Sequence, residues 1–540
     1  MPTANLFAVG TPASGPPPPM PDAVLSLLDP PPPPFFARES VSVLTADEMR
    51  GWDRAAIDRH GVPEPVLMES AGRAAAAVIH RLYPRGRVLV ACGSGNNGGD
   101  GMVVARTLLA WGRQVRVLAA GSKPPADALR HGWEIDVAGV DALEGSVARA
   151  DVLVDALLGT GSTGAPRDPY DRVIRGMTGA GKPIVALDGP SGVDFTTGKA
   201  EADVVSADVT VTFGAPKRGL LLFPGRERCG RIVCVEIGFS PLEGSPGARL
   251  ITPAWAAKHL PPVHANAHKG GMGRVVIVAG RPGMAGASVL AGMGALRAGA
   301  GMAILVAPDA NRQIIQTAIP EALFEDRDEV DDEVFAKADA IVAGPGMGTD
   351  EASLALLRRI IAAAEGPLLF DADATTLLAK NPDLRDGITQ PLLITPHPGE
   401  ASRLLDRPTG EITADPFAAA AELARRYRCT ALLKGAPSLV ASEDEPVLVS
   451  VAGHSGIATG GMGDTLSGVT GAFLARSPGA DVAAGLGLWY CGRAAELAGR
   501  GRGLLPRDVA EHVPAAILES LSPDSELGIA GVTLDLHAAY

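Results

Sequence analysis

Gly460-Gly461-Met462-Gly463-Asp464-Thr465-Leu466-Ser467-Gly468 is the stretch of this sequence that says most about its fold. Its glycines let the backbone approach a ligand closely, and the start of a helix behind them favours a bound phosphate. Asp464 stands at this junction, where a carboxylate could take a proton from a hydroxyl group. The alternative is a plain glycine turn with Asp464 as the helix N-cap.

A second glycine-rich loop favours the binding interpretation. Gly93-Ser94-Gly95-Asn96-Asn97-Gly98-Gly99-Asp100-Gly101 follows the apolar run at 87–92 and precedes an amphipathic segment at 102–112. A strand, a glycine loop and a helix in this order form the usual context of an anion-binding loop. Two such loops in one chain are less easily explained as turns.

The composition limits the class of protein. A chain of 540 residues is too long for one hydrophobic core, so two or three domains are expected. The net charge of −13 argues against nucleic acid as the main partner. The sequence contains no apolar run of about 18 residues, so no membrane span is expected. Five scattered cysteines without a CxxC pair indicate a reducing compartment, and therefore the cytoplasm.

The first 38 residues are rich in proline, with runs at 16–19 and 30–34. These runs predict a disordered or polyproline-II arm. A secretory signal is not expected, because no basic segment precedes an apolar one. Met20 is an alternative start of the protein.

From about residue 40, helical and strand patterns alternate, which predicts parallel βαβ units in a Rossmann-like sheet. Helices are expected at 46–60 and 66–83, and strands at 87–92, 114–120, 151–156, 183–188, 208–213 and 231–237. A Pro-, Gly- and Ser-rich linker at 240–247 interrupts the pattern. Strands resume at 274–279, 302–306, 339–343, 367–371, 392–395, 430–433 and 447–451, and helix follows from Asp464 to about residue 520. We expect two α/β domains and a poorly structured segment over the last 20 residues.

Two motif matches in the first domain are rejected on context. Residues 176–182 fit most of a Walker A loop, but Pro183 replaces the magnesium-binding Ser or Thr and a strand follows instead of preceding. Residues 159–164 fit GxGxxG without a helix behind them, so they are better interpreted as a lid or substrate loop. The loop at 93–98 also fits GxGxxG, and the next strand lacks the acidic residue expected for a ribose. An NAD-dependent dehydrogenase therefore stays only an alternative.

Polar side chains gather at the predicted carboxyl ends of strands in the first domain. Asn96, Asn97 and Asp100 follow one strand, Asp155 ends another, and Asp188 with Ser191 ends a third. In open α/β sheets the ligand crevice lies at these ends. Hard oxygen donors of this kind suit a group I or II cation better than zinc. The alternative for each aspartate alone is a structural cap.

The second domain has a similar set of loops at strand ends, at residues 268–271, 279–287, 344–348, 395–400 and 434–435. His397 lies between two prolines in a rigid loop. Lys434 at a strand end could pair with a phosphate as a point charge, with a solvated surface lysine as the alternative.

These motifs together resemble two known families. The second domain resembles the ribokinase-like ADP/ATP-dependent NAD(P)H-hydrate dehydratases, through His268-Lys269-Gly270 and the loops at 344–348, 395–400, 434–435 and 460–468. The first domain resembles the NAD(P)H-hydrate epimerases, through residues 96–100, 155–161 and 188–192. The tandem order is similar to the bacterial bifunctional NAD(P)H-hydrate repair enzymes. The resemblance covers about residues 40–520 and implies an epimerase domain at 39–243, with a Rossmann-like three-layer sandwich, and a ribokinase-like dehydratase domain at 244–522. The Pro-rich arm at 1–38 and a tail at 523–540 fall outside it.

The resemblance also implies roles for individual residues. Asp464 would be the catalytic base of the dehydratase, and Asp188 the proton shuttle of the epimerase. The epimerase substrate would be held by Asn96, Asn97, Gly98, Gly99, Asp100, Gly159, Thr160, Gly161, Ser162, Thr163, Gly164, Ala165 and Asp188. A potassium ion would be held by Asn97, Asp155 and Ser191. The dehydratase substrate would contact Ala287, Gly346, Gly348, His397 and Asp464, and the nucleotide would contact Lys434, Gly435, Ala436, Pro437, Ser438 and Gly463.

The implied activity is the repair of hydrated NADH and NADPH. The epimerase interconverts the R and S hydrates, and the dehydratase converts the S hydrate with ADP and magnesium into NAD(P)H, phosphate and AMP. The expected partners are these small molecules, without nucleic acid or membrane, in a homo-oligomer. One rival is a ribokinase-like vitamin-precursor kinase with an N-terminal nucleotide-binding interaction module. The first domain discriminates between them, because a kinase does not need it.

Overall fold

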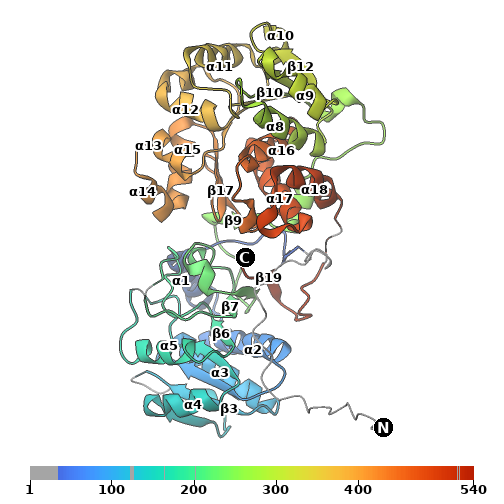
Figure 1. Ribbon diagram of the computed structural model, residues 1–540. Coiled ribbons are helices and arrows are strands. Elements are labelled where there is room, and N and C mark those ends of the chain that lie inside the picture. The colour runs from blue at the N-terminus through green and yellow to red at the C-terminus, as the bar shows by residue number, and fades with distance from the viewer. Residues whose placement is uncertain are drawn as a thin grey trace, which may run out of the picture.

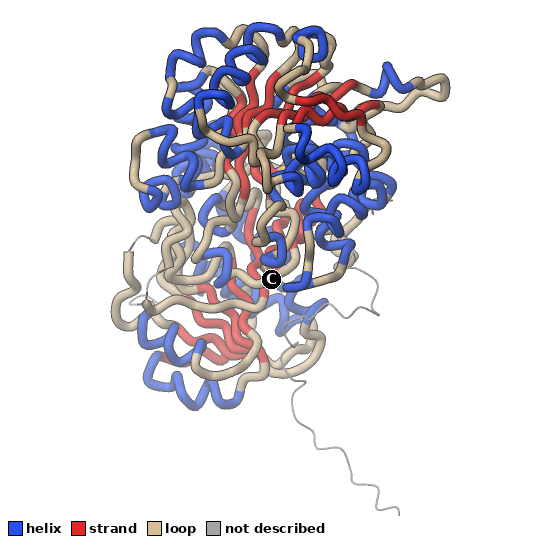
Figure 2. Tube along the Cα trace, turned by 45° about the horizontal axis from the view of Figure 1, so that its top comes forward, coloured by secondary structure: helices blue, strands red, loops and turns tan. Residues whose placement is uncertain are grey.

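A computed structural model describes residues 34–121, 127–162, 164–200, 202–519, 521 and 523–539. Two α/β domains are stacked one on the other, and each is built on its own sheet flanked by helices (Figures 1 and 2). The first domain has a nine-stranded sheet of order β1-β19-β8-β7-β6-β5-β2-β3-β4. The second has a ten-stranded sheet of order β12-β11-β10-β13-β14-β15-β16-β17-β18-β9. The prediction of two α/β domains is confirmed.

Four strands of the first sheet, β2, β5, β6 and β7, are buried along their whole length, as their apolar runs predict. Seven strands of this sheet run parallel to one another. They are β2 Val88–Cys92, β3 Val115–Ala119, β4 Asp136–Gly139, β5 Val152–Ala156, β6 Ile184–Leu187, β7 Val209–Phe213 and β8 Arg231–Val235. The main helices are α1 Ala46–Arg54, which continues as a π-helical turn at Ala55–Arg59, α2 Glu64–Leu82, α3 Asn96–Ala110, α4 Leu143–Arg149 and α5 Tyr170–Thr178. A short helix, α6 Gly225–Arg228, precedes β8.

The second sheet combines a parallel core with an antiparallel edge. The parallel strands are β10 Arg274–Val278, β11 Met302–Ala307, β12 Leu323–Asp326, β13 Ala340–Ala343, β14 Leu368–Phe370, β15 Leu392–Ile394 and β16 Thr430–Leu433. Strands β17 Ser438–Ala441 and β18 Val447–Ser450 continue it in antiparallel fashion, and β9 Ala248–Leu250 closes the edge. The helices are α7 Pro253–His259, α8 Ala285–Arg297, α9 Arg312–Ala318, α10 Asp332–Ala336, α11 Glu351–Ala363, α12 Ala372–Lys380, α13 Pro398–Leu405, α14 Thr409–Ala414, α15 Pro416–Tyr427, α16 Met462–Leu474, α17 Ala480–Ala498 and α18 Pro506–Leu518.

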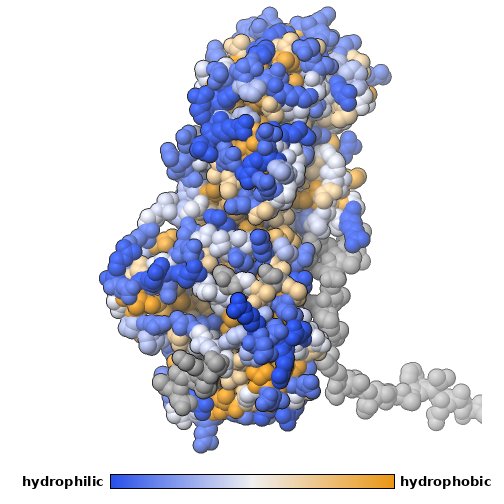
Figure 3. Space-filling view, turned by 90° about the vertical axis from the view of Figure 1, so that its left-hand side faces the viewer, coloured by the Kyte–Doolittle hydropathy of each residue, from blue (hydrophilic) through white to orange (hydrophobic). Residues whose placement is uncertain are grey.

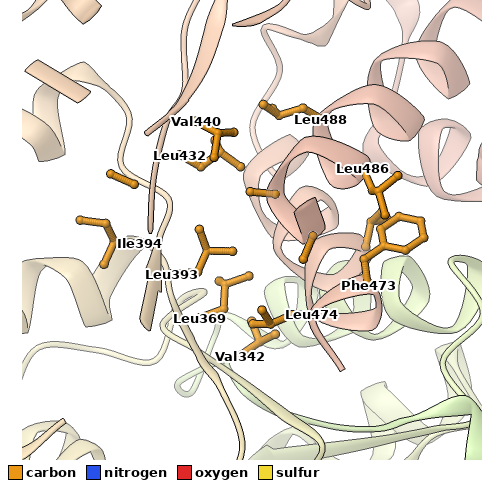
Figure 4. Packing of buried hydrophobic residues seen from close by; sticks show 14 of the residues in the cluster. Val342, Leu369, Leu393, Ile394, Leu432, Val440, Phe473, Leu474, Leu486 and Leu488 are labelled. Carbon is orange, nitrogen blue, oxygen red and sulfur yellow. The ribbon is translucent and has the colours of Figure 1, made fainter. Parts of the chain in front are cut away.

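Helices α16 and α17 pack on one face of the second sheet. Figure 4 shows Val342 and Leu393 of the sheet opposite Leu474 and Leu486 of these helices. A methyl group at Gly468 would lie 1.9 Å from the backbone oxygen of Ala291 in α8. Glycine at this position therefore lets α16 touch α8, and this contact fixes where the N-terminus of α16 points.

The C-terminal segment corrects the sequence prediction. The last 20 residues are not without structure, because β19 Val532–Leu536 pairs with β8 in the first domain. Asp535, 3% exposed, receives two hydrogen bonds from Arg231 at 2.7 and 2.8 Å. A strand this short becomes stable only on a distant partner, which local patterns do not reveal.

The proline-rich arm also differs from prediction where it is described. Phe36–Ala37 forms β1, which pairs with β19 on the edge of the first sheet. Residues 1–33 of the predicted arm lie outside the described residues. Strands β4, β9, β12 and β17 were also not predicted.

The two domains share one buried hydrophobic cluster. Val43, Leu221 and Leu222 of the N-terminal half belong to the same cluster as the core of the second domain. The backbone at Val43 bonds to Ala248 of β9 at 2.9 Å, while its neighbour Leu44 bonds to Pro216 at 3.1 Å. Residues 43 and 44 thus touch both domains, and the chain passes from the first sheet to the second between β8 and β9 and returns after α18.

Hydrophilic residues cover most of the face drawn in Figure 3, with hydrophobic residues in smaller groups between them. Of the described helices, none has both the length and the hydropathy that crossing a bilayer requires.

Two candidate active sites

The first candidate site is a cavity of about 530 Å³ at the carboxyl ends of β2, β5 and β6. It contains many of the residues predicted to bind the epimerase substrate: Asn96, Asn97, Asp100, Gly159, Thr160, Gly161, Ser162 and Asp188. The cavity also includes Asp53 and Glu64 from α1 and α2, which the sequence did not indicate. The loop at 159–162 thus borders a pocket, as a substrate loop should.

The glycines of the 93–101 loop serve mainly to pack helix α3. This helix begins at Asn96, six residues before the predicted start. A methyl group at Gly98 would lie 2.0 Å from the oxygen of Gly93, and one at Gly99 would lie 2.6 Å from the sulfur of Met68. Neither glycine lines the cavity, nor do Gly164 and Ala165, and Thr163 lies outside the described residues.

Asp155 and Ser191 form a tight buried pair beneath this cavity. The Ser191 amide and hydroxyl donate to the Asp155 carboxylate at 2.8 and 2.7 Å, and the Leu157 amide donates at 3.2 Å. Burial nevertheless raises the pKa of Asp155 to about 6, because it outweighs these hydrogen bonds. A carboxylate in this position would gain from a nearby cation.

Asn97 supplies an unused oxygen close to this pair. Its amide nitrogen donates to the oxygens of Leu158 and Leu187 at 3.0 and 3.1 Å. Its Oδ1 atom is buried and has no hydrogen-bond partner. The Leu158 amide donates to Ser191 Oγ at 3.0 Å, which ties Asn97 to the Asp155–Ser191 pair. A buried oxygen without a partner is costly unless a cation or water binds it, so these residues fit an oxygen-ligated cation.

Asp188 is paired with Lys217, a residue that the sequence analysis missed. Lys217 is 1% exposed and donates to the Asp188 carboxylate, and also to Thr212 Oγ1 and the Phe213 oxygen, both at 3.0 Å. The Asp188 backbone is left-handed, with φ of 65°. Lys217 stands four residues after β7, so a basic residue just beyond a predicted strand end was the available signal.

Two further acids face this ion pair. The pKa of Asp100 lies well above its usual value because of burial and the charge of Asp188, although Lys217 opposes the effect. Burial also raises the pKa of Asp53, together with the charges of Glu64 and Asp188. A protonated carboxyl beside a charge-paired carboxylate is an arrangement suited to general acid–base chemistry.

The second candidate site surrounds the start of α16. Gly461 is the N-cap with φ of 90°, which places Asp464 in the first turn. Burial and the charge of Asp371 raise the pKa of Asp464 to about 6, against the opposing charge of Lys434. The pKa of Asp464 therefore lies close to neutral pH, as suits a carboxylate that accepts a proton.

Lys434 is not a solvated surface lysine. Its ammonium lies 2.7 Å from Asp371 and 3.9 Å from Glu400. Burial alone would lower the pKa of Lys434, but these two carboxylates outweigh it and raise the pKa. Asp371 also accepts hydrogen bonds from Thr395 and Ser467, both at 2.8 Å. The sequence analysis missed Asp371, although it is the last residue of the predicted strand at 367–371 and follows directly after β14.

The residues predicted to contact the dehydratase substrate lie in neighbouring loops. A methyl group at Gly346 would lie 3.3 Å from Ala287, so these two residues adjoin. Gly348 donates its amide to Asp373 at 2.9 Å, and the charge of Asp373 contributes to the raised pKa of Asp464. His397 caps α13 and accepts from the Gly399 amide at 3.0 Å, with its ring half-exposed.

A cavity of about 480 Å³ lies on the other side of Lys434. All six residues predicted to bind the nucleotide line it: Lys434, Gly435, Ala436, Pro437, Ser438 and Gly463. A methyl group at Gly463 would lie 3.6 Å from the Lys434 ammonium. The glycine backbone at the N-terminus of α16 and the Lys434 ammonium therefore face the same cavity, which suits a phosphate group.

Within the described residues, no group of three or more His, Cys, Asp or Glu side chains is placed to hold a metal ion. The five cysteines are free thiols.

Two families match the sequence. NAD(P)H-hydrate dehydratase matches residues 275–515, and YjeF-related protein N-terminus matches residues 64–219. The bifunctional NAD(P)H-hydrate repair enzyme Nnr of Escherichia coli is 40% identical over 485 residues, covering 87% of this chain and 92% of that protein. The enzyme of the same name from Moorella thermoacetica is 35% identical over 523 residues, covering 90% of this chain and 98% of its own. One similar solved structure is the ADP/ATP-dependent NAD(P)H-hydrate dehydratase from Bacillus subtilis, co-crystallised with ATP and Mg²⁺. It is 28% identical, and the match covers 49% of this chain and 96% of that one, with a TM-score of 0.45.

Proposed function

The chain belongs to the bifunctional NAD(P)H-hydrate repair enzymes, and we propose that its two domains divide the work between Asp188 in the first and Asp464 in the second. The enzyme repairs hydrated NADH and NADPH by epimerising the two hydrates and dehydrating one of them with a nucleotide. The observation that supports the division of labour most directly is the separate pair of acid–base clusters, Asp188–Lys217–Asp100 and Asp464–Lys434–Asp371.

Epimerisation requires a proton donor and a proton acceptor at one carbon. Hydration of the nicotinamide double bond places a hydroxyl on a carbon next to the ring nitrogen, whose lone pair can expel it. Asp100, with its raised pKa, protonates the leaving hydroxyl so that water departs and a ring iminium forms. Asp188 then accepts a proton from water as the water adds to the other face. Lys217 holds the Asp188 carboxylate in place and balances its charge.

We assign Asn97, Asp155 and Ser191 to a potassium ion beneath the epimerase cavity. The support is the buried, unpartnered Oδ1 of Asn97 beside a buried carboxylate and a hydroxyl. All three donors are hard oxygens, and only one is charged, which suits a monovalent ion. The bound ion would supply a fixed positive charge beneath the substrate.

In the second domain, Asp464 takes the proton of the hydrate hydroxyl as that oxygen attacks the terminal phosphoryl group of ADP. The bond between the two phosphoryl groups breaks, and AMP leaves. The phosphorylated carbon then loses phosphate as the ring nitrogen donates electrons, and loss of a ring proton restores NAD(P)H. Lys434 and the amides at the start of α16 stabilise the charge on the transferring group. Magnesium accompanies the nucleotide phosphates, as a divalent ion usually does.

The substrates are small molecules, and the five free thiols are consistent with a reducing compartment such as the cytoplasm. The test of the proposed function uses the full chain with a mixture of R and S hydrates and ADP. We expect the absorbance of the reduced nicotinamide to return completely, with inorganic phosphate and AMP in equal amounts. A stable phosphorylated product without phosphate release would instead identify a small-molecule kinase. If the absorbance returns only for the S fraction, the protein has no epimerase activity.

A further inference from the structure

The cavity that holds the predicted nucleotide residues has a second wall from the other domain. Phe35, Leu221, Phe223 and Arg226 line the same space as Lys434 and Gly463. The residues that follow β19, from Leu536 to Ala539, complete this wall. The cavity therefore lies between the two domains.

This second wall is held by contacts with both domains. Arg226, 5% exposed, donates to the oxygen of Gly230 at 2.7 Å and to the oxygen of His537. The ion pair of Asp535 with Arg231 fixes the strand just before it. The side chain of Phe35 packs edge-on against Trp489 of α17, with ring centroids 5.5 Å apart. The C-terminal residues are thus a built part of the cavity.

The chemistry of the cavity changes from one side to the other. Lys434 and the α16 N-terminus lie on the side suited to phosphates. The second wall instead offers the apolar surfaces of Phe35, Leu221 and Phe223. Flat aromatic and apolar surfaces suit a heterocyclic base.

We propose that the wall formed by Phe35, Leu221–Arg226 and Leu536–Ala539 binds the base of the nucleotide, so that the dehydratase site is completed by the epimerase domain and the C-terminal strand. The proposal rests on the proposed nucleotide site. The wall segments lie outside the matched residues 64–219 and 275–515. They therefore belong to the region where the two domains of this chain meet, and neither family match includes them.

Two variants test the wall, one shortened at the C-terminus and one with a single substitution. One ends at Leu536, which removes the last part of the wall but keeps β19 and its ion pair. The other is Phe223→Ala, at a side chain that is 43% exposed. Trp133→Ala is the matched control, because Trp133 is 44% exposed and lies outside both cavities.

For both wall variants we expect the Kd and KM for ADP to rise roughly ten-fold, which is the effect of losing one apolar contact of about 1.4 kcal/mol. The kcat at saturating ADP and the epimerase rate should stay within about two-fold of the original enzyme, because only binding common to ground and transition states is lost. Unchanged ADP affinity in both variants would overturn the proposal. Equal losses in ADP affinity, kcat, epimerase rate and Tm would also overturn it, since the wall would then support only the fold. A starting enzyme that does not bind ADP would refute the nucleotide site itself.

Discussion

Lys217 and Asp188 form an ion pair that is almost closed off from solvent at the floor of the first cavity. Both residues follow neighbouring parallel strands, β6 and β7, and so meet at the same edge of the sheet. Asp100 lies close enough for the Asp188 charge to raise its pKa. In the proposed epimerase mechanism, this grouping provides the acid and the base for the reversible loss and return of water.

The first prediction concerns Lys217. Lys217→Met should abolish epimerisation and leave dehydration of the S hydrate intact. It should also destabilise the protein by about 3–5 kcal/mol, because the Asp188 carboxylate stays buried without its partner. Rates with each pure hydrate and denaturant unfolding provide the measurements.

A double variant separates catalysis from stability at this pair. Lys217→Met with Asp188→Asn removes the unpaired charge, so most of the lost stability should return while the epimerase stays inactive. If the double variant regains epimerisation together with stability, the pair serves only the fold.

The second prediction concerns Asp464 as a base. Asp464→Asn should slow dehydration by about 10²–10⁴-fold while ADP still binds. Asp481→Asn is the matched control, because Asp481 lies in the first turn of the next helix, α17. Near-normal turnover in Asp464→Asn would show that another group takes the proton.

The pH dependence of the same step follows from the raised pKa of Asp464. A base must be ionised to act, and the pKa of this carboxyl is about 6 in the fold. The kcat/KM for the hydrate should therefore fall as the pH drops below about 6, and level off above it. In Asp464→Asn this acid limb should be missing from the residual rate. An acid limb near pH 4, close to the ordinary pKa of aspartate, would contradict the desolvated environment.

The main frame of the fold can be read from the sequence, because buried parallel strands form continuous apolar runs. Every strand predicted between residues 87 and 237 is present within a few residues of its predicted bounds. The loops at strand ends likewise predicted where polar residues would meet, since topology alone brings them to one edge. Asn97 after β2 and Asp188 after β6 are examples, for they line one cavity.

What the sequence did not predict depends on contacts between distant segments. β1 and β19 pair with each other although nearly 500 residues separate Ala37 from Val532, and neither has a pattern that predicts its partner. Asp371 and Lys217 were missed for a related reason: a single charged residue after a strand is significant only once its partner is known. A packing role for Gly98 was likewise not predicted, because it depends on the close approach of the Gly93 backbone to the start of α3.

The third prediction concerns potassium. Potassium should raise the Tm relative to a bulky organic cation at pH 7.5, because an ion bound only by the folded protein stabilises it. The pKa of Asp155 is about 6 without the ion, so this carboxyl gains a proton as the pH falls below 6 and the potassium effect should weaken there. Asp155→Ala should lose both the Tm shift and epimerisation, with dehydration unchanged. A potassium-dependent Tm shift that persists in Asp155→Ala would place the ion elsewhere.

The last prediction separates two glycines in the same motif. Gly463→Ala places a methyl group 3.6 Å from the Lys434 ammonium, an ordinary contact, so the free energy of unfolding should change by less than about 1 kcal/mol. The methyl group would nevertheless occupy space at the α16 N-terminus where the phosphates bind, so the KM for ADP should rise and kcat should fall.

Gly468→Ala places its methyl group 1.9 Å from the Ala291 oxygen, so α16 must move away from α8 and the protein should lose several kcal/mol of stability. Gly460→Ala is the control, because no atom lies within 4 Å of its methyl group. Unfolding curves and ADP kinetics of the three variants decide the matter: if Gly463→Ala unfolds as easily as Gly468→Ala, or turns over ADP as well as Gly460→Ala, Gly463 does not form part of a phosphate cradle.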